Sequence, residues 1–133
     1  SRYSADIHFV SGRDDKFLHH AYCGASLLLF PSLAEGFGWP IAEAMACGCL
    51  VVTTNLAPMT EVGAHAAFYI DRMPNNTLEL PFWAHNSAEL VDSIVSAPEH
   101  DLLPLIQACV DNARRFDLDM ALDRIEKIYT EIN

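Results

Sequence analysis

Two short apolar runs, separated by a glycine-rich segment, constrain this chain more than any other feature. The first run is Leu27–Phe30, closed by the breaker Pro31, and the second is Cys49–Thr53. Runs of this length and composition are typical of strands buried in a parallel sheet. A helix between them would complete a strand–helix–strand unit. We therefore expect an α/β fold, with a parallel sheet flanked by helices.

The segment between the runs has the residues of a tight turn that opens a helix. Pro40 suits the first helical position, and Gly48 suits the residue after the last one. Gly36 and Gly38 allow the backbone to approach a ligand closely, with amide groups facing an anion at the helix N-terminus. The turn follows the carboxyl end of a strand, where open α/β sheets bind ligands. This segment therefore predicts a ligand site.

Two carboxylates indicate what kind of ligand would bind there. Glu35 lies in the turn, and Glu43 lies about one turn into the predicted helix. Helical side chains lean towards the N-terminus, so both carboxylates can face the same pocket. Ionised carboxylates accept hydrogen bonds from vicinal hydroxyls, while the amides suit phosphate. The combination is typical of a site for a sugar nucleotide.

The string from Glu35 to Glu43 resembles the E-x7-E motif of retaining, nucleotide-sugar-dependent glycosyltransferases. These are the glycogen-synthase-like group, glycosyl transferases group 1, whose GT-B fold has two Rossmann-like domains. Clear similarity extends over residues 6–71, with a looser fit beyond. Further segments similar to the family are Phe30-Pro31-Ser32, Glu43–Gly48, Val51-Val52-Thr53, Ala57-Pro58, Glu61-Val62 and Ala67–Asp71.

The resemblance assigns roles to the residues of the motif. It implies that Glu35 holds the hydroxyls of the donor sugar and is the candidate catalytic residue. It also implies that Glu43 binds the ribose diol of the nucleotide. Gly36, Phe37 and Gly38 would offer backbone amides to the sugar or the diphosphate.

The resemblance also extends to the segment before the first apolar run. Asp6–Val10 is expected to be a strand, and the turn after it, with Gly12 and Arg13, resembles the base-contacting loop of the family. In the usual doubly wound order, two further strands separate this strand from Leu27–Phe30. We expect both of them to be missing from this chain, which would leave unpaired backbone groups. We therefore expect either direct pairing of Asp6–Val10 with Leu27–Phe30, or a homodimer in which a second copy supplies the missing edge.

The implied reaction is transfer of a sugar from a nucleoside-diphosphate sugar to a hydroxyl acceptor: a sugar, a lipid-linked glycan or another glycan. Residues 1–133 would be one partial domain, the C-terminal Rossmann-like domain without its first strands. The N-terminal acceptor domain would be absent, so the fragment alone is expected to be inactive. Two alternatives remain open. One is a non-catalytic nucleotide-sugar-binding module, and the other is a different Rossmann enzyme such as an epimerase, which would not explain the two spaced glutamates.

Charge and hydropathy exclude several other partners. A formal net charge of −10 argues against binding to nucleic acid or to anionic lipid. No apolar run approaches the length of a membrane span, and the N-terminus shows no signal-peptide pattern. We therefore expect no membrane contact from this segment. The four cysteines are interpreted as reduced thiols, which indicates a cytoplasmic location.

No metal ion or other cofactor is expected from the sequence. The four cysteines show no zinc-ribbon or zinc-finger spacing. Cys47 and Cys49 flank Gly48 and could reach one metal, but buried free thiols usually behave as small hydrophobic groups. His19 and His20 point about 100° apart on a helix and cannot bind one ion together.

The remaining pattern predicts mainly helices. The expected helices run from Asp14 or Asp15 to about Cys23 or Gly24, over Pro58–Val62, from Ser87 to about Val95, over Leu102–Phe116, and over an amphipathic closing stretch, Met120–Ile132. A last strand is expected at Ala66–Ile70. Phe82 and Trp83 fall in a long loop, Pro74–Asn86, whose role the sequence does not indicate.

Overall fold

The computed structural model describes residues 6–12, 14–117, 119, 122–123, 127–128 and 130. Its centre is a parallel sheet in the order β1-β2-β3, with β1 at Leu27–Phe30, β2 at Leu50–Thr54 and β3 at Phe68–Ile70. The helices are α1 (Asp15–Gly24), α2 (Trp39–Ala46), α3 (Met59–Gly63), α4 (Leu80–Val95) and α5 (Glu99–Ala113), and α5 continues into a 3₁₀ turn, Arg114–Phe116. This arrangement confirms the expected α/β fold with a Rossmann-like parallel sheet.

The middle strand β2 is the best-buried part of the sheet. Leu50 pairs with Leu27 of β1, and Val52 pairs with Phe68 of β3. Every residue of β2 is buried because the strand has a neighbour on both edges and helices pack against it. Thr53, the residue before the last one of β2, donates a hydrogen bond from Oγ1 to the carbonyl of Phe30 over 2.8 Å.

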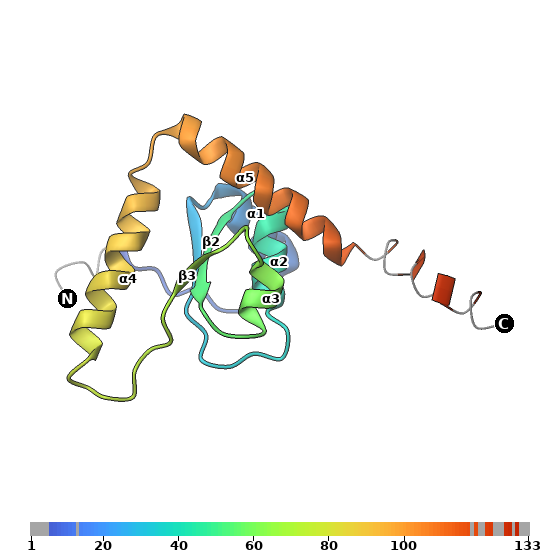
Figure 1. Ribbon diagram of the computed structural model, residues 1–133. Coiled ribbons are helices and arrows are strands. Elements are labelled where there is room, and N and C mark those ends of the chain that lie inside the picture. The colour runs from blue at the N-terminus through green and yellow to red at the C-terminus, as the bar shows by residue number, and fades with distance from the viewer. Residues whose placement is uncertain are drawn as a thin grey trace.

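Helix α2 and the helices packed on it lie on one side of the sheet, and α4 lies on the other (Figure 1). Helix α2 packs against α1, α3 and α5, and α5 crosses over α2 (Figure 1). In the same view α4 lies across the sheet from α2 and α3. The buried core gathers around α2, β2 and α3, with its largest fully buried side chains at Ile41, Met45, Met59, Val51, Val52 and Val62.

The expected helix ends around the motif are confirmed. Asp14 caps α1, because its Oδ1 accepts a hydrogen bond from the backbone amide of Phe17 over 2.9 Å. Gly48 has a φ of +74°, the left-handed conformation expected after a helix. Helix α2 begins at Trp39, one residue earlier than expected, so Pro40 lies within its first turn.

The strand expected at Asp6–Val10 is wrong. Residues 6–12 contain no strand, all of them are exposed, and Phe9 is 97% exposed. Within the described part of the chain, β1 pairs with β2 alone, so the expected pairing of Asp6–Val10 with β1 is also wrong. The physical reason is that the backbone groups of a strand need hydrogen-bond partners in a neighbouring strand, and no described strand lies beside residues 6–10 to supply them.

The expectation of a long loop at Pro74–Asn86 is also wrong. Helix α4 begins at Leu80, because Pro81 suits the first helical turn, and it therefore contains Phe82, Trp83 and Ser87. Ser87 is thus inside the helix and does not cap it. The helix expected at Leu102–Phe116 begins earlier, at Glu99, and its last residues form the 3₁₀ turn.

Most of the closing stretch 120–132 lies outside the described residues. Among the helices that the structure describes, none is both long enough and apolar enough to cross a membrane.

Candidate functional site

The turn between β1 and α2 has a shape that depends on Gly38. This residue is buried and has a φ of +97°, a conformation that residues with a side chain rarely adopt. Its carbonyl accepts a hydrogen bond from the amide of Ile41 over 3.0 Å, which starts the helix. A Cβ at Gly38 would also lie only 3.3 Å from Cδ1 of Ile41. The turn lies at the carboxyl end of β1, at the same end of the sheet as the segment after β2 (Figure 1).

Glu35 lies in this turn and is exposed. Its Oε1 is 2.8 Å from Oγ of Ser32, and the same hydroxyl oxygen is 3.1 Å from the carbonyl oxygen of Ala34. Both oxygens are acceptors and the hydroxyl has one proton, so Ser32 donates to one of them at a time, and the shorter distance favours the carboxylate of Glu35. A carboxylate oriented in this way is a suitable acceptor for hydroxyl groups.

Glu43 projects from α2 between two cavities. One cavity, of about 390 Å³, lies against α1, and the other, of about 350 Å³, lies between α2 and the end of α5. Oε2 of Glu43 is 3.5 Å from the phenol oxygen of Tyr22 on α1. Burial, and then the charge of Glu43, raise the pKa of Tyr22, so the phenol remains a donor at neutral pH.

Glu35 is not among the residues that line either of these cavities. The structure therefore places the two glutamates on the turn and on the helix that follows it, and a pocket shared by both stays a prediction. Their roles, and the roles of the amides of Gly36, Phe37 and Gly38, also stay predictions.

The side chain of Phe37 anchors the turn to the rest of the molecule. Its ring centroid is 4.7 Å from that of Trp39, and it meets the ring of Phe116 edge-on at 5.4 Å. Trp39 itself remains 59% exposed and lines the cavity beside α5, together with Glu43 and Arg114. An aromatic face, a guanidinium and a carboxylate thus surround one opening.

The other predicted nucleotide contacts are less well defined. Gly12 is exposed, has a φ of +64° and has open space where a Cβ would stand. Arg13 lies outside the described residues. The base-contacting role of this pair stays a prediction.

A further cavity, of about 480 Å³, lies where the chain leaves β3 and meets α4. Arg72, Phe82 and Trp83 contribute to its lining. The indole Nε1 of Trp83 donates to the carbonyl of Asp71 over 2.7 Å and so ties α4 to the end of β3. Because β3 is parallel to β1, this cavity opens at the same end of the sheet as the motif turn. Sequence reasoning missed it because it placed the two aromatic residues in a loop.

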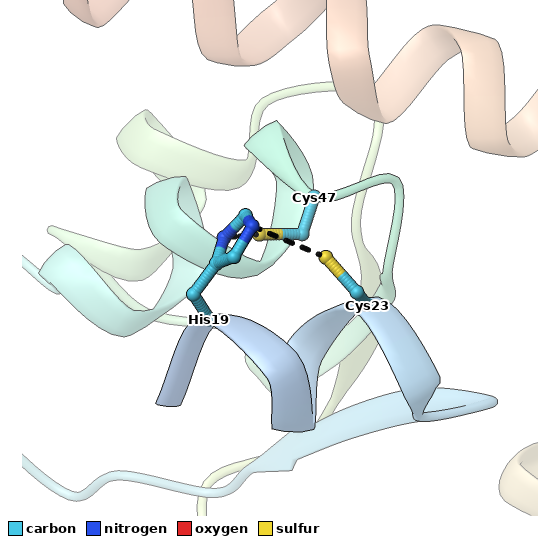
Figure 2. Close-up of side chains that lie close together, drawn as sticks. All are labelled: His19, Cys23 and Cys47. Carbon is cyan, nitrogen blue, oxygen red and sulfur yellow. Dashed lines mark hydrogen bonds between the residues drawn. The ribbon is translucent and has the colours of Figure 1, made fainter. Parts of the chain in front are cut away.

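Sequence reasoning also missed a cluster of His19, Cys23 and Cys47, whose side chains point towards one another (Figure 2). The partner considered for Cys47 was Cys49, but Cys49 is buried, with its Sγ 3.5 Å from the carbonyl oxygen of Leu50. The four-residue spacing of His19 and Cys23 was the signal available in the sequence. All four cysteines are free thiols.

Two curated bacterial proteins are similar to this chain. It is 39% identical over 70 residues to O-antigen chain mannosyltransferase B of Escherichia coli, a match that covers 53% of this chain and 18% of the relative. It is 33% identical over 88 residues to O-antigen chain mannosyltransferase RfbU of Salmonella typhimurium, covering 66% of this chain and 24% of the relative. The matches thus span about a quarter or less of these relatives. No solved structure matches the chain significantly.

The comparison with protein families covers most of the chain. The sequence profile of the family described as "Glycosyl transferases group 1" matches residues 2–115. The match includes the sheet, α2 with the two glutamates around its start, and all of α5. This chain belongs to the glycosyl transferases group 1 family.

Proposed function

We propose that the protein containing this chain is a retaining glycosyltransferase that moves a sugar from a nucleoside-diphosphate sugar to a hydroxyl acceptor. This chain would supply part of the donor site, and the acceptor would bind through a domain outside it. The observation that supports the proposal is the glycine turn Glu35–Gly38 between β1 and α2, the helix that carries Glu43, in a chain of this family.

The proposed chemistry follows from the groups around the turn. The amides at the start of α2 would stabilise the diphosphate, because unpaired N–H groups and the helix dipole favour negative charge there. Glu35 would accept hydrogen bonds from hydroxyls of the donor sugar, and Glu43 from the ribose diol. In a retaining transfer, the nucleotide leaves on the face from which the acceptor attacks. No metal ion takes part in this proposed step.

The names of the similar proteins indicate which donor sugar to test first. Both similar bacterial proteins are named as mannosyltransferases. We therefore propose a mannose-bearing nucleotide as the first donor to test, and a glycan or lipid-linked glycan as the acceptor. A cytoplasmic location, and a homodimer of the chain, stay predictions.

The test is a thermal-shift and calorimetric panel on the full-length protein. The panel contains mannose and glucose linked to guanosine, uridine and adenosine diphosphates, each measured with and without a chelator. We expect one donor to bind tightly and to be consumed, with retention of anomeric configuration, when a glycan acceptor is added. Binding without turnover on any acceptor would favour the non-catalytic module instead, and no binding of any donor would contradict both.

A further inference from the structure

Three metal-ligating side chains meet between α1 and the end of α2 (Figure 2). Nε2 of His19 lies 3.7 Å from Sγ of Cys23, and Nδ1 of the same ring lies 3.3 Å from Sγ of Cys47. One ligand atom from each of the three residues lies within 4.8 Å of the other two. One imidazole and two thiols therefore surround a single point.

Local structure and packing explain why these residues meet. His19 and Cys23 are four residues apart on α1, so their side chains share one face of that helix. Cys47 is the residue that ends α2, and the left-handed Gly48 turns the chain away immediately after it. Because α1 packs on α2, the end of α2 delivers Cys47 to the face that carries the other two residues.

We propose that His19, Cys23 and Cys47 bind one Zn²⁺ ion. Zinc takes thiolate sulfur at about 2.3 Å and imidazole nitrogen at about 2.0–2.1 Å in tetrahedral sites, which puts neighbouring ligand atoms about 3.4–3.8 Å apart. The separations of 3.3 and 3.7 Å are measured from the two different ring nitrogens, and one ligand atom from each residue lies within 4.8 Å of the other two, so the three side chains would draw closer together around the ion. Because the two short contacts use different ring nitrogens, the imidazole turns to present one of them to the ion.

The charge balance of this site is simple. Binding releases one proton from each thiol to the solvent, so two thiolates and a neutral imidazole surround a divalent cation with no net charge. Acidic groups lie beside the cluster, because Asp15 and Glu43 line the cavity that His19 and Cys47 also line. The negative charge of these carboxylates destabilises thiolates that have no counter-ion and favours a bound cation that neutralises the thiolates.

The ion can reach the site without opening the core. His19 and Cys23 are exposed and Cys47 is half-buried. Three protein ligands leave the fourth tetrahedral position for a water molecule. The site would join α1 to the helix that carries Glu43, four residues before Cys47, so its role is to hold these helices together. It has no part in the proposed sugar transfer.

The experiment uses full-length protein that is stripped with a chelator and kept reduced with a phosphine. Calorimetry with zinc chloride should show one ion per chain and micromolar or tighter affinity, and the melting temperature should rise with zinc. Cobalt(II) should give the charge-transfer absorption of thiolate ligands. Nucleotide binding, measured separately, reports on the proposed function independently of zinc.

Matched variants locate the ion. His19→Gln, Cys23→Ser and Cys47→Ser should each weaken zinc binding by roughly 100-fold or more. His20→Gln, which changes the adjacent residue on another face of α1, should leave zinc affinity unchanged. Circular dichroism checks that each variant is folded.

Two results would overturn the zinc site even if a cysteine variant failed to fold. The first is wild-type protein that binds zinc no more tightly than about 100 μM, or cobalt without thiolate absorption. The second is an equal loss of affinity in His19→Gln and His20→Gln.

Discussion

The phenol oxygen of Tyr22 on α1 lies 3.5 Å from the carboxylate Oε2 of Glu43 on α2. Tyr22 therefore contacts one oxygen of the carboxylate and limits how the side chain can rotate. A carboxylate held in this way meets a ligand with its orientation already set, which reduces the entropy lost on binding. The contact also joins α1 to the helix that begins at the motif turn.

Glu43→Gln should weaken donor binding more than it weakens folding. The change keeps the size of the side chain but removes the charge that strengthens hydrogen bonds to a diol. Charge-assisted bonds contribute about 1.5–3 kcal/mol, so affinity for the nucleoside diphosphate should fall about tenfold or more. Calorimetry on the full-length protein measures this loss. Glu61→Gln, on the exposed surface of α3, is the matched control, and an unchanged dissociation constant for Glu43→Gln would remove this residue from the ribose role.

Gly38→Val should abolish donor binding while the protein still melts cooperatively. The φ of +97° at Gly38 is strained for any residue with a side chain, at about 1–3 kcal/mol, and the new Cβ would press on Ile41. Gly24→Ala, at the end of α1, is the control, because open space surrounds the position of its Cβ and no positive φ applies there. Donor titrations followed by thermal melts compare the two variants. Wild-type donor affinity in Gly38→Val would show that the turn has no role in binding.

Asn112→Ala should lower the free energy of unfolding by about 1–3 kcal/mol, because it leaves buried polar groups without partners. Asn112 is 3% exposed, donates from Nδ2 to the carbonyl of Val62 over 2.8 Å, and accepts from Arg115 over 2.8 Å. Urea denaturation measures the change. Asn86→Ala, at an exposed position on α4, should change stability by less than about 0.5 kcal/mol. Equal effects of the two substitutions would contradict the role given to Asn112.

Stability should fall as pH rises above about 9, partly because of Cys109. Burial, and then the nearby Cys49, raise the pKa of the Cys109 thiol to about 11, whereas an unfolded cysteine ionises near 8.5. Between these two pH values the folded state binds more protons than the unfolded state, so the free energy of unfolding falls by up to about 1.4 kcal/mol per pH unit. Below this range both states keep the thiol protonated, and the stabilising contribution of Cys109 is fully present. Cys109→Ala should flatten this part of the pH profile in urea denaturation. Parallel profiles for the two proteins would contradict the assignment.

The positions of glycine and proline made the strand–helix–strand unit of β1, α2 and β2 predictable. Gly38 and Gly48 adopt the positive φ values that their positions around a helix suggested, and Pro40 lies in its first turn. The apolar runs became β1 and β2, as their short length and the flanking Pro31 and Gly48 suggested. These features depend on residue type and on neighbours in sequence, so sequence alone could indicate them.

Features that depend on distant contacts were less predictable. Residues 6–10 alternate like a strand, but a strand forms only when another strand pairs with it. Helix α4 begins at Leu80, and Trp83 is held there by a bond to Asp71 that no local pattern indicates. In the same way, the four-residue spacing of His19 and Cys23 on α1 could indicate at most a pair of ligands, and only packing against α2 brings Cys47 to them.

The packing of α5 across α2 sets an order of assembly during synthesis. Strands β1, β2 and β3 pair with their nearest neighbours in sequence, so the sheet can form while later residues are still in the ribosome. Helix α5 comes last, yet Asn112 pairs with Val62, and Phe116 packs on Phe37 in the motif turn. A nascent chain that has not yet released Phe116 would therefore hold a paired sheet beside a motif turn that still lacks its contact with Phe116.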